Sequence, residues 1–152
     1  MRKFQRFRAF KIDPNDVLYS QIIRFGQTRC WKCGKHRDLQ ACHIISRGDY
    51  ATRFLLEPVR NAIPLCAGDH DWFDTHTSND ILFNEELQKI PQPDNRWWFL
   101  VKKCGYTWQD LILLYRLSQR CVKYTTFYAQ EVKVQLKAEL KRLERRAEEV
   151  RE

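Results

Sequence analysis

Apolar residues near the N-terminus recur at the spacing of an α-helix. In the stretch IDPNDVLYSQIIRFG, Asp13 can cap a helix, Pro14 fits the first helical turn and Gly26 stands where a helix would end. The pattern therefore predicts a helix over residues 14–25. The residues that this helix would turn inward are Val17, Leu18, Ile22 and Phe25.

Three later stretches predict further elements. The segment PQPDNRWWFLVKKCG, residues 91–105, predicts a turn and a short strand. Thr107 followed by Asp110 has the spacing of a capping box, which predicts a helix over TWQDLILLYRLSQR. The chain from about residue 127 to residue 152 lacks glycine and proline and is rich in charge, which indicates one long helix.

Leucines in this last helix repeat at heptad spacing. The seam is formed by Leu136, Leu140, Leu143, Ala147 and Val150. It could pair with the same seam of a second chain to give a homodimer, or it could lie on its own domain. A seam of about two heptads is shorter than the three to four that usually make a coiled coil, which slightly favours packing within the chain.

Composition and charge indicate one soluble domain with a basic end. The 152 residues are 43% hydrophobic and 30% charged, enough for one modest core. The formal net charge is +8, and the first eleven residues hold five Lys and Arg and no acid. This basic arm, residues 1–12, suits a polyanion such as DNA, although a solubilising terminus explains it equally well.

No segment has the pattern of a membrane span or of a leader peptide. The apolar stretches fall short of the roughly 20 residues needed to cross a bilayer, and no apolar segment follows the N-terminal charges. We therefore expect a cytoplasmic protein with no membrane partner. In such a reducing compartment, the six cysteines are better explained as metal ligands or free thiols than as disulfides.

Two ligand pairs with the same spacing predict a structural Zn²⁺ site. Cys30 and Cys33 form a CxxC turn followed by glycine, and Cys66 and Asp69 repeat the spacing of three. Asp69 is equally explained as a helix cap, and His36 is a rival for the fourth ligand position. A single CxxC could also be redox-active.

The segment between these pairs predicts a hairpin followed by a helix. It has His43 on a strand, Asn61 after a long loop, a return strand IPL, and His70 opening a helix with Asp74 one turn on. This order resembles the HNH, or ββα-metal, nuclease family. The likeness is greatest to phage and prophage members with CxxCG, LQxxHIISR, ATR and NxxxLCxxCH elements, which match RCWKCGK, LQACHIISRGDYATRF and NAIPLCAGDH over about half of the chain.

The resemblance implies a metal-dependent DNA endonuclease that hydrolyses phosphodiester bonds. His43 would be the general base, and the amide of Asn61 would brace the hairpin loop. His70 and Asp74 would hold a divalent cation such as Mg²⁺ or Mn²⁺, with His76 as a substitute for Asp74. Three arginines in or beside the loop would hold phosphates, if they do not merely serve solubility: Arg47, Arg53 and Arg60.

The chain departs from the family pattern at two positions. Cys42 precedes the base where many members have a metal-binding Asp or His, and Asp69 stands where the family usually has Cys. Alternation along a strand points Cys42 away from His43, which favours a small apolar residue that faces the core.

The expected fold class is α+β, with a small zinc-stapled ββα core flanked by an N-terminal helix and C-terminal helices. Its segments would be the arm at 1–12, the nuclease core with the preceding helix and zinc knuckle at 13–80, a helical and strand extension at 81–126, and the long helix at 127–152. Two alternatives are a non-catalytic zinc-knuckle DNA-binding module on the same scaffold and a nuclease that acts on RNA.

Overall fold

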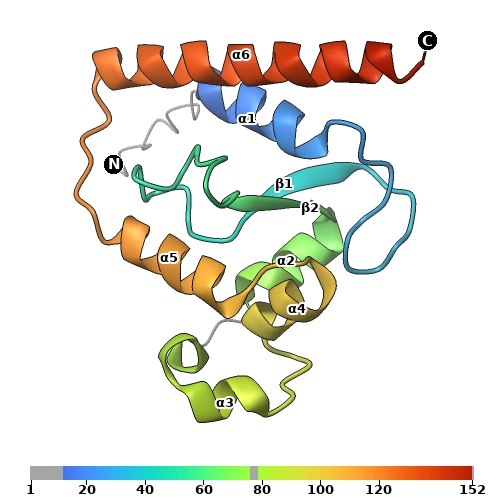
Figure 1. Cartoon of the computed structure of the whole chain (residues 1–152), viewed down its shortest axis with the longest axis vertical. Helices are drawn as coiled ribbons and strands as arrows, with labels where there is room; N and C mark the ends of the chain where they lie inside the picture. Colours follow the sequence, from blue (N-terminus) through green and yellow to red (C-terminus); the bar gives the residue numbers. More distant parts are fainter. Residues whose placement is uncertain (1–11, 76–78, 152) are drawn as a thin grey trace, which may run out of the picture.

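The protein has an α+β fold built around one two-stranded antiparallel sheet (Figure 1). The computed structural model describes residues 12–75 and 79–151, so most of the basic arm and His76 lie outside the described residues. Strand β1 (Leu39–His43) pairs with β2 (Ala62–Cys66), with Leu39 opposite Cys66 and His43 opposite Ala62. The helices are α1 (Pro14–Arg24), α2 (Ala67–Thr75), the 3-10 helix η1 (Asp80–Phe83), α3 (Glu85–Lys89), α4 (Arg96–Lys103), α5 (Trp108–Ser118) and α6 (Thr126–Glu149).

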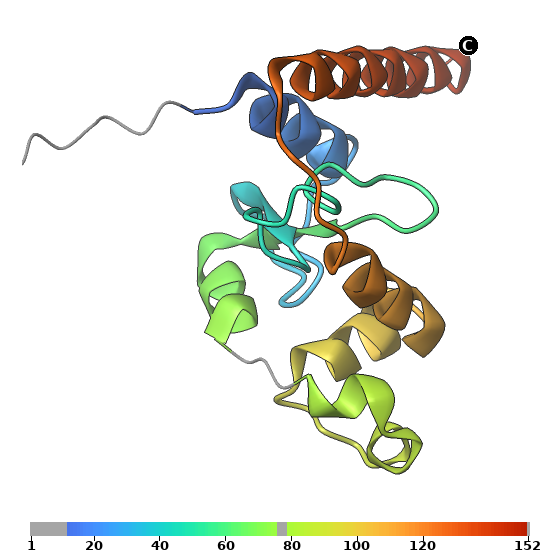
Figure 2. The same cartoon turned by 90° about the vertical axis from the view of Figure 1, so that its left-hand side faces the viewer.

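The sheet separates two apolar clusters. Helices α1 and α6 lie on one side of the sheet, and α2, α4 and α5 lie on the other (Figures 1 and 2). Ala41 packs against the cluster of α1 and α6, whereas Cys42 and Ile44 belong to the other cluster. This is the alternation expected of a strand, and it places successive side chains of β1 in different surroundings.

Helix α1 begins where its cap predicts, and part of its expected inward face is buried, including Ile22. The Asp13 side chain accepts a hydrogen bond from the Asn15 backbone N–H, and α1 ends at Arg24. The buried residues are Asn15, Tyr19, Ile22 and Ile23. The prediction for Val17 is wrong, because its side chain is 45% exposed. It lies two residues from Tyr19 and therefore on the far side of the helix.

Residues 96–103 form helix α4, where the sequence suggested a strand. The Asn95 side chain accepts a hydrogen bond from the Trp97 backbone N–H at 2.9 Å and so caps the helix. Trp97 and Leu100, three positions apart, are both fully buried. A short apolar run flanked by proline and glycine fits either element, and the cap together with this spacing decides for the helix.

Helix α6 packs along α1 of the same chain. Leu136 is buried, and Leu140 and Leu143 pack against the cluster that contains Ile22. The seam as far as Leu143 is therefore covered within the chain, whereas Val150 is 87% exposed. A homodimer through α6 stays a prediction, for which sedimentation is the test. Neither α6 nor any other helix in the described ranges is long and apolar enough to cross a membrane.

Candidate functional site

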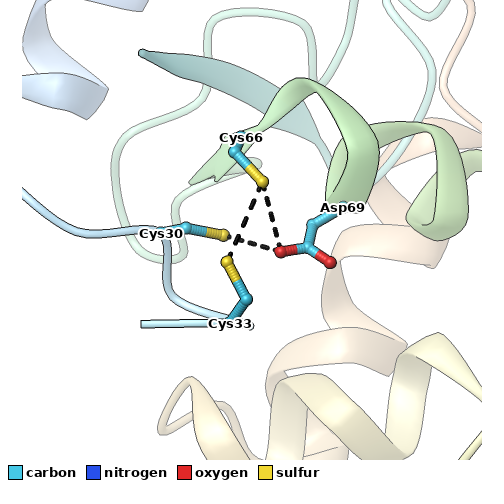
Figure 3. Close-up of side chains that lie close together, drawn as sticks. All are labelled: Cys30, Cys33, Cys66 and Asp69. Carbon is cyan, nitrogen blue, oxygen red and sulfur yellow. Dashed lines mark hydrogen bonds between the residues drawn. The ribbon is translucent and has the colours of Figure 1, made fainter. Parts of the chain in front are cut away.

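Four potential metal ligands from three segments meet beside the end of the hairpin (Figure 3). The Asp69 carboxylate oxygen Oδ2 lies 3.0 Å from Cys30 Sγ and 3.3 Å from Cys66 Sγ, and Cys33 Sγ lies 4.0 Å from Cys66 Sγ. This group, Cys30, Cys33, Cys66 and Asp69, could hold a metal ion, and we call it the knuckle group. His36 is exposed and is not part of it.

Local backbone geometry explains how the knuckle group forms. Gly34 has a φ of +70°, and its N–H donates to the Cys30 carbonyl at 2.9 Å, which closes the turn between the two cysteines. The Trp31 N–H donates to the Pro64 carbonyl at 3.2 Å and ties this turn to β2. Asp69 lies within the first turn of α2, which starts earlier than expected, so its side chain reaches the thiols.

The Asp69 carboxylate is held in its charged form. Burial alone would raise its pKa, but hydrogen bonds from the thiols of Cys30, Cys33 and Cys66 outweigh burial and bring the pKa to about 2. The Lys32 ammonium, 3.4 Å from Asp69 Oδ1, acts in the same direction. An anionic oxygen among three sulfurs is a donor set suited to a borderline-soft divalent ion.

A cavity of about 800 Å³ lies along the outer edge of β1, between α1 and α2. It brings together side chains from four parts of the chain. Among them are His43, Arg47, His70, Asp74 and Arg96. Two histidines, a carboxylate and two guanidinium groups around one space can bind an anion, bind a cation and exchange a proton.

His43 is fixed in the wall of this cavity as a neutral imidazole. Its ring stacks on Tyr19 with centroids 5.4 Å apart, and its Nε2 lies 3.0 Å from the Arg53 carbonyl oxygen. A carbonyl oxygen can only accept, so Nε2 carries the proton and Nδ1 keeps its lone pair. Burial lowers the pKa of His43 to about 4, which keeps the ring neutral at physiological pH.

Asn61 is fully buried and ties the loop of the hairpin together. Its Oδ1 accepts from the Ile45 N–H at 2.8 Å, while its Nδ2 donates to the carbonyls of Ile45 at 3.1 Å and Thr52 at 3.0 Å. The side-chain amide uses its acceptor and both donors on loop backbone. Because Thr52 precedes Arg53, whose carbonyl holds His43, this loop sets the orientation of the imidazole.

Three potential ligands form a second group on the side of α2. The sulfur of Cys42, a ring nitrogen of His70 and a carboxylate oxygen of Asp74 all lie within 4.8 Å of one another, and we call these three residues the cavity group. From the sequence we expect His70 and Asp74 to hold a metal and Cys42 to be a core residue. Cys42 is indeed fully buried, yet its sulfur faces the other two ligands.

Gln40 orients His70, a contact that sequence reasoning missed. The Gln40 Oε1 lies 2.8 Å from His70 Nδ1. An amide oxygen accepts a hydrogen bond, so Nδ1 is the donor and Nε2 is the nitrogen that faces Asp74 Oδ2, 3.4 Å away. This is the arrangement by which an outer partner commonly fixes a metal-binding histidine. Gln40 lies three residues before His43, and nothing in that spacing identifies it.

The three predicted phosphate-binding arginines have different surroundings. Arg47 is 66% exposed at the cavity, 4.0 Å from Asp16. Arg53 is 13% exposed and donates through Nε to Asp16 at 3.0 Å, with Asp13 also within ion-pair distance. Arg60 lies against α6, 3.8 Å from Glu139, and does not line the cavity.

Arg96, at the start of α4, is a further basic residue in the cavity wall. Its guanidinium lies over the Trp97 ring at 4.4 Å and the Phe73 ring at 5.1 Å. Its buried Nε has no hydrogen-bond partner among the residues described. Burial lowers its pKa to about 10, which still leaves the side chain charged at neutral pH. Sequence reasoning missed Arg96 because the segment was expected to be a strand outside the core.

Comparison with family models, with curated proteins and with solved structures found no match to this chain.

Proposed function

We propose that the protein is a metal-dependent endonuclease that hydrolyses phosphodiester bonds in DNA at the cavity beside β1. The observation that carries this proposal is the convergence of His43, His70 and Asp74 on one cavity whose wall also holds Arg47 and Arg96. A phosphodiester presents an anionic phosphoryl group, an attacking water and a leaving oxygen, and each needs a different partner. The cavity offers one chemical group for each of them.

His43 supplies the general base. Its Nε2–H is engaged by the Arg53 carbonyl, so Nδ1 is the nitrogen that can take a proton from water. A neutral ring is required for this step, and the lowered pKa provides it. A base with a pKa near 4 is weak in the ground state, so its strength must come from an environment that stabilises imidazolium in the transition state. Asp16, which acts on the ring as a favourable negative charge, contributes to that.

Cationic residues of the cavity supply the binding of phosphate. Arg47 is exposed at the cavity, where a DNA backbone could meet it, and the Arg96 guanidinium is held over the Trp97 ring in the wall. Arg53, by contrast, is neutralised by Asp13 and Asp16, and we assign it a structural part. The net charge of +8 favours a polyanionic substrate in general.

His70 and Asp74 hold the divalent ion in this proposal. When bound, such an ion stabilises negative charge on the phosphoryl and leaving oxygens. The residues fit this purpose, because Gln40 holds the His70 ring with Nε2 toward the Asp74 carboxylate. Both ligands also line the cavity, where a phosphate oxygen could reach the ion.

The knuckle group, we propose, binds a structural Zn²⁺. Three thiols and one carboxylate supply four ligands, the number that closed zinc sites use. The group joins the turn before β1 to the start of α2, so an ion there would fix the hairpin against the helix that carries His70. The ion would thereby support the cavity from a distance.

A second candidate function is a DNA-binding module without catalysis. Two observations favour it: the fully buried Cys42 takes a place beside His70 and Asp74, and His43 has a strongly lowered pKa. In that case the cavity would bind phosphate through Arg47 and Arg96 without hydrolysing it.

Incubation with supercoiled plasmid tests the proposal. Purified protein is mixed with plasmid and Mg²⁺, Mn²⁺, Ni²⁺ or Zn²⁺ in turn, and nicked and linear products separate one-strand from two-strand cutting. We expect ion-dependent cleavage that is lost in His70→Ala and kept in His36→Ala, a matched histidine change outside both ligand groups. Binding of DNA with no cleavage under any ion would favour the module instead, and cleavage of RNA alone would change the substrate.

A further inference from the structure

We propose that the Cys42 thiolate is the third protein ligand of the cavity ion, so that the cavity group selects a thiophilic divalent ion such as Zn²⁺ over Mg²⁺. The inference deepens the proposed function and rests on it for the part that the ion plays in hydrolysis. The ligand set itself stands on geometry, because the donor atoms of Cys42, His70 and Asp74 lie within 4.8 Å of one another.

The position of Cys42 is explained only in part by packing. It is fully buried in the same apolar cluster as Ile44 and Ile63, as a small apolar residue would be. Its sulfur, however, also lies within 4.8 Å of donor atoms of His70 and Asp74. Sulfur, imidazole and carboxylate together form a donor set that suits a borderline-soft divalent ion.

His70 and Asp74 give independent support. Because His70 Nδ1 donates to Gln40 Oε1, Nε2 faces the Asp74 Oδ2 at 3.4 Å. A divalent ion could take the place of a proton between these two atoms. The sulfur of Cys42 lies on the same side, so one ion can meet all three donors.

The geometry needs only small adjustments to accept zinc. Zinc bonds of about 2.0–2.3 Å place neighbouring ligand atoms of a tetrahedron roughly 3.3–3.8 Å apart. Asp74 is 59% exposed, and so its carboxylate can rotate toward the buried sulfur and ring nitrogen. His70 and Asp74 line the cavity, so an ion held by three protein ligands could keep a fourth position for a cavity water or substrate, which is the usual arrangement of catalytic zinc.

The donor set decides which ion binds. Thiolate and imidazole favour Zn²⁺ and Cd²⁺, whereas Mg²⁺ prefers oxygen ligands and retains its waters. A site in which one of three ligands is sulfur should therefore discriminate strongly against Mg²⁺. Replacing that sulfur by a carboxylate, as in Cys42→Asp, should move the preference toward Mg²⁺ and Mn²⁺.

Cadmium-113 NMR of the full chain tests the inference without relying on activity. The probe is Cd²⁺ added to protein from which metal has been removed. We expect two resonances, one from the knuckle group with three sulfur ligands and one from the cavity group with one. Cys42→Asp should shift the cavity resonance and leave the knuckle resonance in place, and Cys104→Ala, which removes a half-buried thiol of the same apolar cluster, should leave the cavity resonance unchanged.

A second variant guards against a failure to fold. Cys42→Ala puts no charge into the core, and the knuckle resonance reports that the fold is intact. In calorimetric titration we expect this variant to bind Zn²⁺ at the cavity more weakly than the wild type. The loss of affinity should exceed the roughly 10- to 100-fold that follows when a residue hydrogen-bonded to a metal ligand is removed, because here the ligand itself is lost. The same titration should show knuckle binding equal to that of the wild type.

Two results would overturn the inference, and they have different consequences for the proposed function. A cavity resonance that is identical in wild type, Cys42→Asp and Cys42→Ala would mean that His70 and Asp74 hold the ion without sulfur. The proposal of metal-dependent hydrolysis would then still stand, whereas the proposal that the Cys42 thiolate is a ligand would be wrong. A knuckle resonance alone, with no second signal in the wild type, would remove both the thiolate ligand and the cavity ion.

Discussion

The two ligand groups both include residues of α2 and differ in almost every physical respect. The knuckle group has four ligands, three of them sulfur, and joins two chain segments far apart in sequence. The cavity group has three ligands, of which His70 and Asp74 line a cavity of about 800 Å³ that also has basic residues around it. A closed set of four ligands suits a structural ion, and an open set of three suits an ion that must also meet a substrate.

One short helix contributes ligands to both groups. Asp69, in its first turn, reaches the thiols, and His70, the next residue, points instead toward the cavity. Successive residues on a helix are about 100° apart, so neighbours in sequence face different directions. An ion at the knuckle group would hold the end of α2 that presents His70.

The largest effect should come from emptying the knuckle group. Cys66→Ser removes one of the four ligands of this group. Because metal binding contributes directly to folding, we expect the free energy of unfolding to fall by several kcal/mol and the protein to unfold at ordinary temperatures. Thermal melts followed by circular dichroism measure this. Cys42→Ala is the matched change at the cavity group, and it should melt close to the wild type. Equal destabilisation by both variants would erase the distinction between the two groups.

The next largest effect should come from replacing Arg53, a change that distinguishes a structural arginine from one that we propose binds phosphate. Arg53→Met leaves Asp13 and Asp16 without their buried cation, which should cost about 3 kcal/mol of unfolding free energy. Arg47→Met, an exposed arginine of the same cavity edge, should cost little. Urea denaturation compares them. If Arg53→Met were as stable as the wild type, the ion pairs with α1 would not hold the loop.

The acid dependence of stability should report the burial of His43. Its folded-state pKa of about 4 lies below the ordinary value of 6.5, so the unfolded chain takes up the proton first as the pH falls. The neutral His43 ring therefore contributes about 3 kcal/mol to the free energy of unfolding. This contribution is fully present above about pH 6.5 and is lost as the pH falls from 6.5 to about 4.

Denaturation at several pH values, with Zn²⁺ saturating, checks this dependence in wild type, His43→Leu and His36→Ala. The loss of stability at acid pH should be smaller in His43→Leu than in the wild type. It should be unchanged in His36→Ala, because His36 is exposed. A wild-type curve that is flat between pH 6.5 and pH 5 would contradict the burial of a neutral ring.

The smallest effect should be on the salt dependence of DNA binding. Arg47→Ala removes about one phosphate contact, so the slope of log affinity against log salt should become shallower by roughly 0.9. Arg60→Ala is the control, because that side chain lies against Glu139 of α6 and outside the cavity. Fluorescence anisotropy over a salt series measures both. A larger change for Arg60→Ala would place the DNA on another face.

Much of the fold could be predicted from local signals. The caps at Asp13 and Thr107 fix where α1 and α5 begin, and the spacing of Cys30, Cys33, Cys66 and Asp69 anticipated a group that could hold a metal ion. These signals depend on residues close together in sequence or on a repeated spacing. The short strand expected within residues 91–105 was wrong, because the five consecutive apolar residues there carry no period that separates a strand from a helix.

The cavity could be predicted only in part, because its walls depend on tertiary packing. Gln40 contacts His70 across thirty residues, and Arg96 reaches the cavity because α4 packs beneath the sheet. The direction of Cys42 was expected correctly from strand alternation, but the approach of α2 to its sulfur depends on the packing of the helix on the hairpin. Long-range contacts of this kind leave no mark on a local pattern.

The rate of plasmid cleavage by His43→Ala beside the wild type tests the central claim most directly. Loss of the general base should slow cleavage by about a hundred- to ten-thousand-fold, while DNA affinity and the circular dichroism spectrum stay close to wild type, because affinity comes mainly from basic residues on phosphates. Added imidazole should restore part of the rate in this variant and none in His70→Ala. A His43→Ala protein that cleaves at the wild-type rate, in a preparation free of contaminating nucleases, would contradict the claim that this cavity activates water through His43.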